Sequence, residues 1–228
     1  MHSDNYWSEL FTATQVTLSL AAVSTLFLIC VCPFLAWWIA RSQSKARPLL
    51  EAITSLPLIL PPTVIGFYLL ISISPDGFIG QPWTAVTGKN LAFSFNGLVI
   101  GSFIYSLPFV LQPLVASFRN INEGLMEAAA ALGAPPATRF LSLILPMHKR
   151  ALISAATLGF AHTLGEFGIV LMIGGNLKGE TRVLSIVLFD QVESLRYQDA
   201  HSTALFMLAL ALVTLTLIYR LQNNEKNA

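Results

Sequence analysis

The chain has 228 residues, of which 54% are hydrophobic and only 11% are charged, and its mean hydropathy is +0.66. Soluble domains carry about 25% charged residues, so this chain has too little charge to cover a surface in water. The bilayer must therefore solvate much of it. The basic residues behind the net charge of +1 lie at the ends of apolar runs rather than on one face, which excludes nucleic-acid binding. The length favours one unit over residues 1–228.

The first apolar run carries no charged side chain over residues 10–40, which exceeds the ~20 residues that span a bilayer. A cleaved signal peptide would have a basic start and a short apolar core, whereas Asp4 and Glu9 precede a long one. We therefore expect a permanent membrane helix over residues 12–40, kinked at Pro33.

The second expected span, residues 52–73, begins with a proline-rich segment that cannot be one regular helix. Proline lacks the backbone N–H and clashes with the preceding turn. Broken helix at membrane depth is tolerated where it packs within protein or lines a cavity. Pro61 and Pro62 are therefore candidates for a functional break. A proline-kinked packing helix without such a role is an equally good interpretation.

The rest of the chain contains three further apolar runs and two polar connections. The third run is interrupted by Pro108. Before it, a Pro/Gly/Asn-rich segment is expected to be an exposed loop, and after it comes a polar segment of unusual composition. The expected spans are 95–117, 151–173 and 201–219, the exposed loop is 74–94, and the polar segment is 119–150.

Five spans would leave the termini on opposite sides of the membrane, and the basic residues are distributed unevenly between those sides. One side holds nine of them, namely Arg41, Lys45, Arg47, Arg119, Arg139, Lys149, Arg150, Arg220 and Lys226. The other holds Lys89, Lys178, Arg182 and Arg196. The positive-inside rule then predicts an outside N-terminus, a cytoplasmic C-terminus and a cytoplasmic 119–150 segment.

No enzyme motif is present, and the chain is not expected to be an enzyme. The segment Gly174–Thr181 has the glycine spacing of a phosphate-binding loop, but Glu180 stands where that loop needs lysine. Cys30 and Cys32 are too close for a disulfide within one helix and too few for a metal site, so they are interpreted as small hydrophobic residues. We expect no metal and no cofactor.

The polar segment 119–150 contains a short capped helix. Glu123 and Glu127 lie four apart on one face near its N-terminus, where negative charge suits the helix dipole. Gly133 suits the position after the helix, and Pro135 prevents continuation. This composition predicts a stiff, short helix lying off the membrane, and docking of such a helix in a groove of another protein is one interpretation. Composition alone favours the alternative, an interfacial loop helix without a partner.

The detailed spacing in this segment resembles the cytoplasmic loop signature of the membrane subunits of ABC importers. It consists of Glu127-Ala128-Ala129, Gly133, Leu143 and Leu145-Pro146, with leucine where the family most often has isoleucine. The resemblance implies a type I ABC importer-like fold, all-α, with about five transmembrane helices and a cytoplasmic coupling helix. It also implies that the loop, with Glu123, inserts into a cleft on a separate ATP-binding subunit and transmits its closure.

A narrower resemblance covers nearly the whole chain. Leu164–Gly168, Gly179–Arg182 and Leu58–Pro62 are similar to the molybdate-type permeases of that family. Sulfate permeases are similar but tend to have tyrosine where Phe167 stands. The resemblance implies a membrane path for molybdate, with sulfate or tungstate as alternatives.

Glu166 is the only acid in an otherwise apolar run, and such a residue is a functional candidate by default. An acid is an odd contact for an anion, since like charges repel. We favour a role in fixing helix geometry through hydrogen bonds to backbone opened by Gly165 and Gly168, with a direct gate role as the alternative. Thr163 completes this group of candidates for the path or gate.

The resemblance also implies partners. These are a second copy of the chain around a central path, a pair of ATP-binding subunits and a periplasmic or extracellular substrate-binding protein, in a bacterial inner membrane whose lipid surrounds them. No Lys or Arg lies within an expected span, which suits a path that releases its anion. Two other classes stay open, namely a secondary transporter that works without an ATPase and a non-transporting membrane scaffold.

Overall fold

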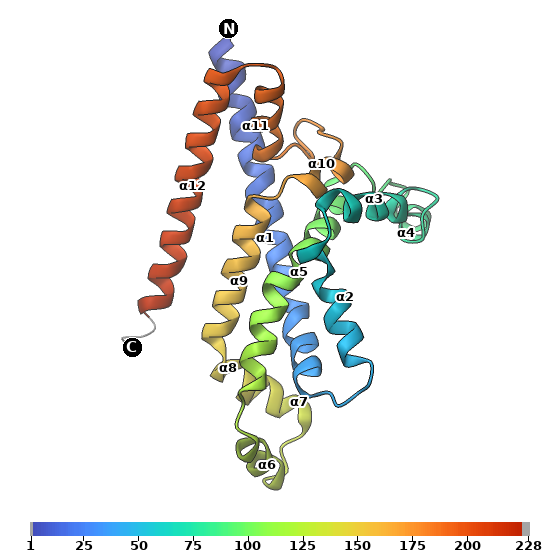
Figure 1. Cartoon of the computed structure of the whole chain (residues 1–228), viewed down its shortest axis with the longest axis vertical. Helices are drawn as coiled ribbons and strands as arrows, with labels where there is room; N and C mark the ends of the chain where they lie inside the picture. Colours follow the sequence, from blue (N-terminus) through green and yellow to red (C-terminus); the bar gives the residue numbers. More distant parts are fainter. Residues whose placement is uncertain (1, 225–228) are drawn as a thin grey trace.

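The computed structural model describes residues 2–224, and every regular element in that range is a helix (Figure 1). The longer helices are α1 (His2–Arg41), α2 (Arg47–Ile59), α3 (Pro62–Ile73), α4 (Gly80–Thr87), α5 (Phe95–Arg119), α6 (Glu123–Ala131), α9 (Lys149–Leu164), α10 (Gly168–Gly174), α11 (Leu184–Glu193) and α12 (Tyr197–Asn224). Three short elements join α6 to α9, namely α7 (Pro136–Thr138), the π-helix η1 (Arg139–Ile144) and α8 (Leu145–Met147).

Helices α1, α5 and α9 form the central bundle. Gly159 of α9 lets the helices approach closely, because a Cβ there would lie 2.6 Å from Val110 Cγ2 of α5. Small residues at such crossings are typical of membrane bundles. Cys32 of α1 is buried in this core, as expected of a small hydrophobic residue, whereas Cys30 is exposed on the outside of the bundle.

Three helices of the described residues are long and apolar enough to cross a bilayer alone, namely α1, α5 and α12. Two bent pairs can each add one more. Helices α2 and α3 meet at 113°, and α9 and α10 meet at 62°. The first break confirms the expected interruption, since Pro61 caps α3 and Pro62 is its first residue. The second divides a run that the sequence suggested would be continuous.

Proline had less effect elsewhere than expected. The interruption expected at Pro108 is wrong, because α5 continues through both Pro108 and Pro113. Helix α1 contains Pro33 and continues to Arg41, and the kink expected at Pro33 stays a prediction. Proline is tolerated inside membrane helices where neighbouring groups satisfy the freed backbone carbonyls.

The segment 74–94 is not simply a loop, because it contains α4. The chain turns so tightly before this helix that a Cβ on Gly80 would lie 1.9 Å from the carbonyl oxygen of Ser74. After α4, Leu91 is fully buried, and the amide of Phe93 donates a hydrogen bond to the carbonyl of Ile173 (2.9 Å). The segment is therefore built into the bundle rather than exposed throughout.

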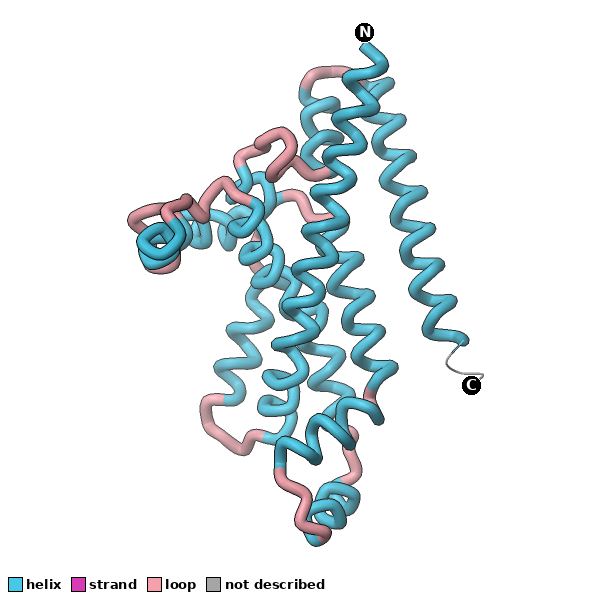
Figure 2. Tube along the Cα trace, turned by 180° about the vertical axis from the view of Figure 1, so that it is seen from behind, coloured by secondary structure: helices cyan, strands magenta, loops and turns pink. Residues whose placement is uncertain are grey.

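Helix α12 stands apart from the bundle for most of its length (Figures 1 and 2). It contacts α11 and, more lightly, α9, and near its start the hydroxyls of Tyr6 and Thr203 are hydrogen bonded (3.1 Å). Its apolar side chains are largely exposed, including Leu205, Leu208, Leu212, Val213 and Leu217. The N-terminus and α6 lie at opposite ends of the molecule (Figure 1).

Candidate functional site

The predicted loop helix is α6, and both of its ends are closed as the sequence suggested. At its start the side chain of Asn122 accepts a hydrogen bond from the amide of Gly124 (2.9 Å). At its end the amides of Gly133 and Ala134 donate to the carbonyls of Ala130 (2.9 Å) and Ala129 (3.0 Å). This is a Schellman motif, and Gly133 has the left-handed φ of +80° that it requires.

One side of α6, its bare face, is exposed, and the other side packs against the bundle core. Glu127 and Ala128 are exposed, Ala129 is partly exposed, and Leu132 is 89% exposed. By contrast Met126 is buried in the bundle core. A large apolar side chain held in the open on a capped helix is the arrangement expected of a docking element.

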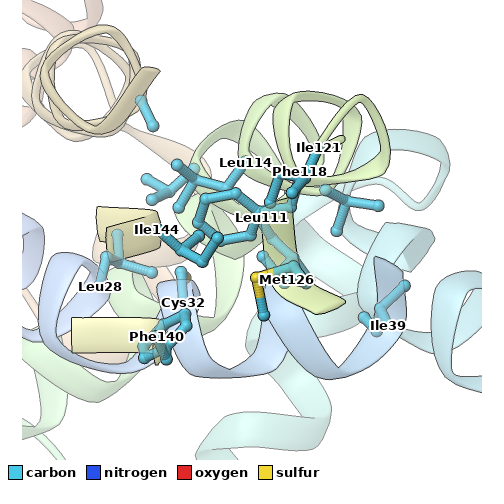
Figure 3. Close-up of a cluster of buried hydrophobic side chains, with 14 residues drawn as sticks. Leu28, Cys32, Ile39, Leu111, Leu114, Phe118, Ile121, Met126, Phe140 and Ile144 are labelled. Carbon is cyan, nitrogen blue, oxygen red and sulfur yellow. The ribbon is translucent and has the colours of Figure 1, made fainter. Parts of the chain in front are cut away.

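Four buried side chains of the 119–150 segment belong to the bundle core, as Figure 3 shows. They are Ile121 before α6, Met126 of α6 and, from η1, Phe140 and Ile144, which pack with the α1 and α5 side chains. The ring of Phe140 lies 5.6 Å from that of Trp37. The α6 segment is therefore packed directly against α1 and α5.

The remaining predicted coupling residues lie around this anchor. Glu123 forms an exposed ion pair with Arg41 at the end of α1 (3.5 Å). Leu145 is partly buried against the core, and Pro146 is exposed. Between α7 and α9 the chain forms the π-helix η1 followed by the short α8.

The second group of candidate residues lies at the two helix breaks, and the structure brings these breaks together. A Cβ on Gly168, the first residue of α10, would lie 2.7 Å from Pro62 Cβ at the start of α3. One on Gly66 of α3 would lie 2.9 Å from Met172 Cβ of α10. Pro61 is exposed beside this junction. Helices α3 and α10 thus pack at two glycines.

Glu166 and Gly165 form the non-helical turn between α9 and α10. The side chain of Glu166 is only 4% exposed, and its carboxylate oxygens have no hydrogen-bond partner among the described residues. The expected carboxylate–backbone hydrogen bond is therefore wrong for this structure. The turn is held instead by the Ser185 hydroxyl, which donates to the backbone carbonyl of Glu166 (2.6 Å).

Thr163 belongs to a buried polar cluster one turn earlier. Ser106 Oγ of α5 lies 3.0 Å from Thr163 Oγ1 and 2.8 Å from His162 Nδ1. The imidazole also stacks on Phe109, with ring centroids 3.9 Å apart. His162 is thus a satisfied packing residue, and the cluster fixes α9 against α5 just before the break.

The coupling residues and the break residues are not brought together. The first group lies at the end of the molecule that carries α6, and the second lies nearer the N-terminal end (Figure 1). Helices α5 and α9 run between the two groups. No group of three or more metal-ligating side chains is found among the described residues.

Sequence reasoning missed two ion-pair networks. Near the N-terminal end, Arg182 pairs with Glu9 and with Asp190, each at 2.6 Å, and ties the loop before α11 to α1. At the other end, Arg47 and Arg119 both pair with Glu51. Only the Arg47–Glu51 pair carried a sequence signal, the spacing of four residues on one helix.

Comparison with known proteins gives consistent matches along the chain. Residues 32–224 match the family of binding-protein-dependent transport system inner membrane components. The chain is 44% identical to the molybdenum transport system permease protein ModB of Azotobacter vinelandii, over 91% of this chain and 92% of that one. It is 31% identical to the sulfate transport system permease protein CysT of Escherichia coli, over 96% and 80%.

Solved structures share the fold at lower identity. A bacterial ABC transporter that imports the acidic polysaccharide alginate matches with a TM-score of 0.78 at 20% identity, covering 96% of this chain and 83% of that one. The inward-facing MetNI methionine ABC transporter matches with a TM-score of 0.71 at 16% identity, covering 96% of each. The predicted fold class, an all-α membrane protein of the type I ABC importer kind, is confirmed.

Proposed function

This chain belongs to the family of binding-protein-dependent transport system inner membrane components, and we propose that it is the permease subunit of an ATP-driven molybdate importer. The observation that supports molybdate as the cargo is the 44% identity to a molybdenum permease over nearly the full length of both chains. The chain has the several apolar helices of a multi-pass inner-membrane protein. On this proposal it has no catalytic site of its own, and ATP is hydrolysed on a separate subunit.

The bare face of α6 is the docking surface for that ATP-binding subunit. Glu127, Ala128 and Gly133 line a short capped helix whose small residues allow close approach. Because Met126 and Phe140 anchor the segment in the core, closure of two ATP-binding subunits would move α1 and α5 together with α6. In a dimer of this chain, that movement opens the path outward, and hydrolysis returns it inward.

The gate is the junction of α3 and α10. The α2–α3 span and the α9–α10 span are both broken here, next to each other. Each break leaves backbone N–H and C=O groups without helical partners at membrane depth, where they can line a path. Pro62 and Gly168 form the contact, with Pro61 and Gly165 beside it. Glu166 and Thr163 add buried polar side chains at and just before the turn that leads into α10. Separation of α3 from α10 would open this contact.

The orientation follows from charge. The end that carries α6 also holds Arg41, Arg47 and Arg119, so we place it in the cytoplasm and the N-terminus outside. A substrate-binding protein then docks at the outer end. A second identical chain, together with lipid, covers the exposed apolar surfaces. On this proposal the 119–150 segment that contains α6 is cytoplasmic, because its ATP-binding partner is a cytoplasmic subunit.

Reconstitution tests the cargo. The chain, its ATP-binding subunit and its binding protein are placed in liposomes, and molybdate and sulfate are compared as stimulants of ATP hydrolysis and uptake. Stimulation by molybdate supports the proposal. Preference for sulfate would instead support the second candidate, which the match to CysT favours. Uptake without the ATP-binding subunit would indicate a secondary transporter, and no uptake with any partner would indicate a scaffold.

Cysteine labelling tests the orientation. In a background with Cys30→Ser and Cys32→Ser, a single cysteine is introduced by Asn5→Cys or by Leu132→Cys. A membrane-impermeant maleimide should label the first variant from the periplasmic side and the second only after the membrane is opened. The opposite pattern would overturn the proposed topology.

A further inference from the structure

A groove of about 270 Å³ lies between α2 and α5 at the end of the molecule that carries α6. Its floor is apolar and includes Ile39 of α1 and Leu111 of α5. Its walls are polar, with Glu51 and Ser55 on α2 and Arg119 on α5. The groove is distinct from the coupling face and from the α3–α10 junction, and neither of those uses its polar residues.

Two guanidinium groups converge on a single carboxylate oxygen in this groove. Arg119 Nη2 donates to Glu51 Oε1 (2.7 Å), and Arg47 Nε donates to the same atom (2.8 Å). The three groups together carry a net charge of +1. Each guanidinium has five N–H donors in a planar fork, so the single shared oxygen leaves donors to spare. Arg119 is 43% exposed and can reach a ligand in the groove.

Neutral polar groups continue the same wall. The Gln112 side-chain amide donates one hydrogen bond to Ser55 Oγ (3.1 Å), and the Ser55 hydroxyl in turn donates to the Glu51 carbonyl (2.7 Å). This orients the amide nitrogen of Gln112 toward α2, about two helical turns before Arg119. An amide N–H and a guanidinium on one helix wall form a donor pair for an anion.

We propose that this groove binds a tetrahedral oxyanion, held by Arg119 and Gln112, and that the Glu51 carboxylate occupies the guanidinium groups when no anion is present. Arginine forks match the geometry of tetrahedral oxyanions, and the competing carboxylate keeps the affinity low enough for release. The inference deepens the proposed function, because it places a cargo-release site at the inner end of the path. Arg119 is the last residue of α5, directly before the coupling segment.

Isothermal titration of molybdate tests the site, with the complete complex in nanodiscs of neutral phosphatidylcholine, at low salt and without the binding protein. Arg119→Gln should weaken binding by about tenfold or more, since a hydrogen bond to a charged group is lost. Arg119→Lys should lie between the two, and Glu51→Gln should tighten binding. The matched control is Arg196→Gln, because Arg196 is equally exposed and also ion-paired, to Asp199, but at the other end of the molecule.

Unchanged affinity in Arg119→Gln, or no molybdate binding in any disc, would overturn the inference. If Arg119→Gln does not assemble, Gln112→Leu replaces it, and the same loss of affinity is expected. A lipid phosphate has the same chemistry as the cargo, so a second arm uses discs with phosphatidylglycerol. Retention of this lipid by the unaltered complex but not by Arg119→Gln, measured by mass spectrometry, would identify the lipid headgroup as the occupant of the same site.

Uptake by proteoliposomes separates this inference from the proposed function. Binding that depends on Arg119 without any uptake would refute the importer and leave the site standing. Uptake by the unaltered complex with binding that does not depend on Arg119 would refute the site and leave the importer standing.

Discussion

At the residue scale, two glycines three positions apart illustrate how similar sequence signals can have different structural reasons. Gly165 ends α9 with a negative φ, and a Cβ there would have no neighbour closer than 4.0 Å. Gly168 begins α10, and a Cβ there would lie 2.7 Å from Pro62 Cβ. Gly168 is therefore required by packing, whereas the structure would accept a side chain at Gly165.

The two positions make a matched pair of variants. Gly168→Ala should destabilise the protein by about 1–3 kcal/mol through overpacking against Pro62, and it should reduce uptake. Gly165→Ala should leave both nearly unchanged. Thermal unfolding in detergent and uptake in proteoliposomes measure these effects. Equal effects of the two variants would contradict the proposed α3–α10 contact.

Glu166 is tested by an isosteric change. Glu166→Gln keeps the shape of the side chain but removes the acid, so uptake should fall several-fold while membrane insertion is unchanged. The control is Glu193→Gln at the exposed end of α11. Unchanged uptake by Glu166→Gln would remove this residue from the functional group.

At the element scale, α6 is packed into the bundle core on one side and exposed on the other. Its anchor is the packing of Met126, Phe140 and Ile144, and its outer face ends at Leu132. Different residues therefore serve for docking on the ATP-binding subunit and for packing α6 against the core, so each role can be disrupted without the other.

Two variants distinguish these roles. Phe140→Ala should destabilise the protein by about 3–5 kcal/mol, because it empties part of the core between α1 and α5. Leu132→Ala should change stability by no more than about 0.5 kcal/mol, since the side chain is exposed, yet it should reduce co-purification of the ATP-binding subunit. Retained co-purification in Leu132→Ala would show that this leucine is outside the docking surface.

At the scale of the whole molecule, the buried Arg182 network joins distant parts of the chain. Arg182 is 8% exposed and bridges Glu9 of α1 and Asp190 of α11. Arg182→Gln should destabilise the protein by about 3–5 kcal/mol, because Asp190 loses its ion-pair partner and Glu9 keeps only its longer contact to Lys178. Lys178→Gln is the control, since Lys178 is largely exposed and pairs with the same Glu9 at 3.8 Å. Its effect should stay below about 1 kcal/mol.

The sequence predicted what depends on local pattern and missed what depends on distant pairing. Apolar runs located the long helices, and the glycine and proline of the coupling segment predicted the C-terminal end of α6. Proline was a poor guide alone, because the break at Pro61 is real while α5 continues through Pro108. The contacts on which the proposed function depends are formed between helices, by side chains that are distant in the sequence. The Pro62–Gly168 contact and the Arg119–Glu51 pair join residues far apart in the chain, so no local signal could reveal them.

The contact between Pro62 and Gly168 also imposes an order on biosynthesis. About a hundred residues separate the two, so at about 5–20 residues per second the ribosome needs several seconds to deliver α10 after α3. In the folded protein α2 and α3 are bent at 113°, and if this bend forms before α10 is made, no later helix yet covers the backbone there. Lipid cannot satisfy such groups. We therefore expect α3 to stay in a protected, partly hydrated environment until α10 is made.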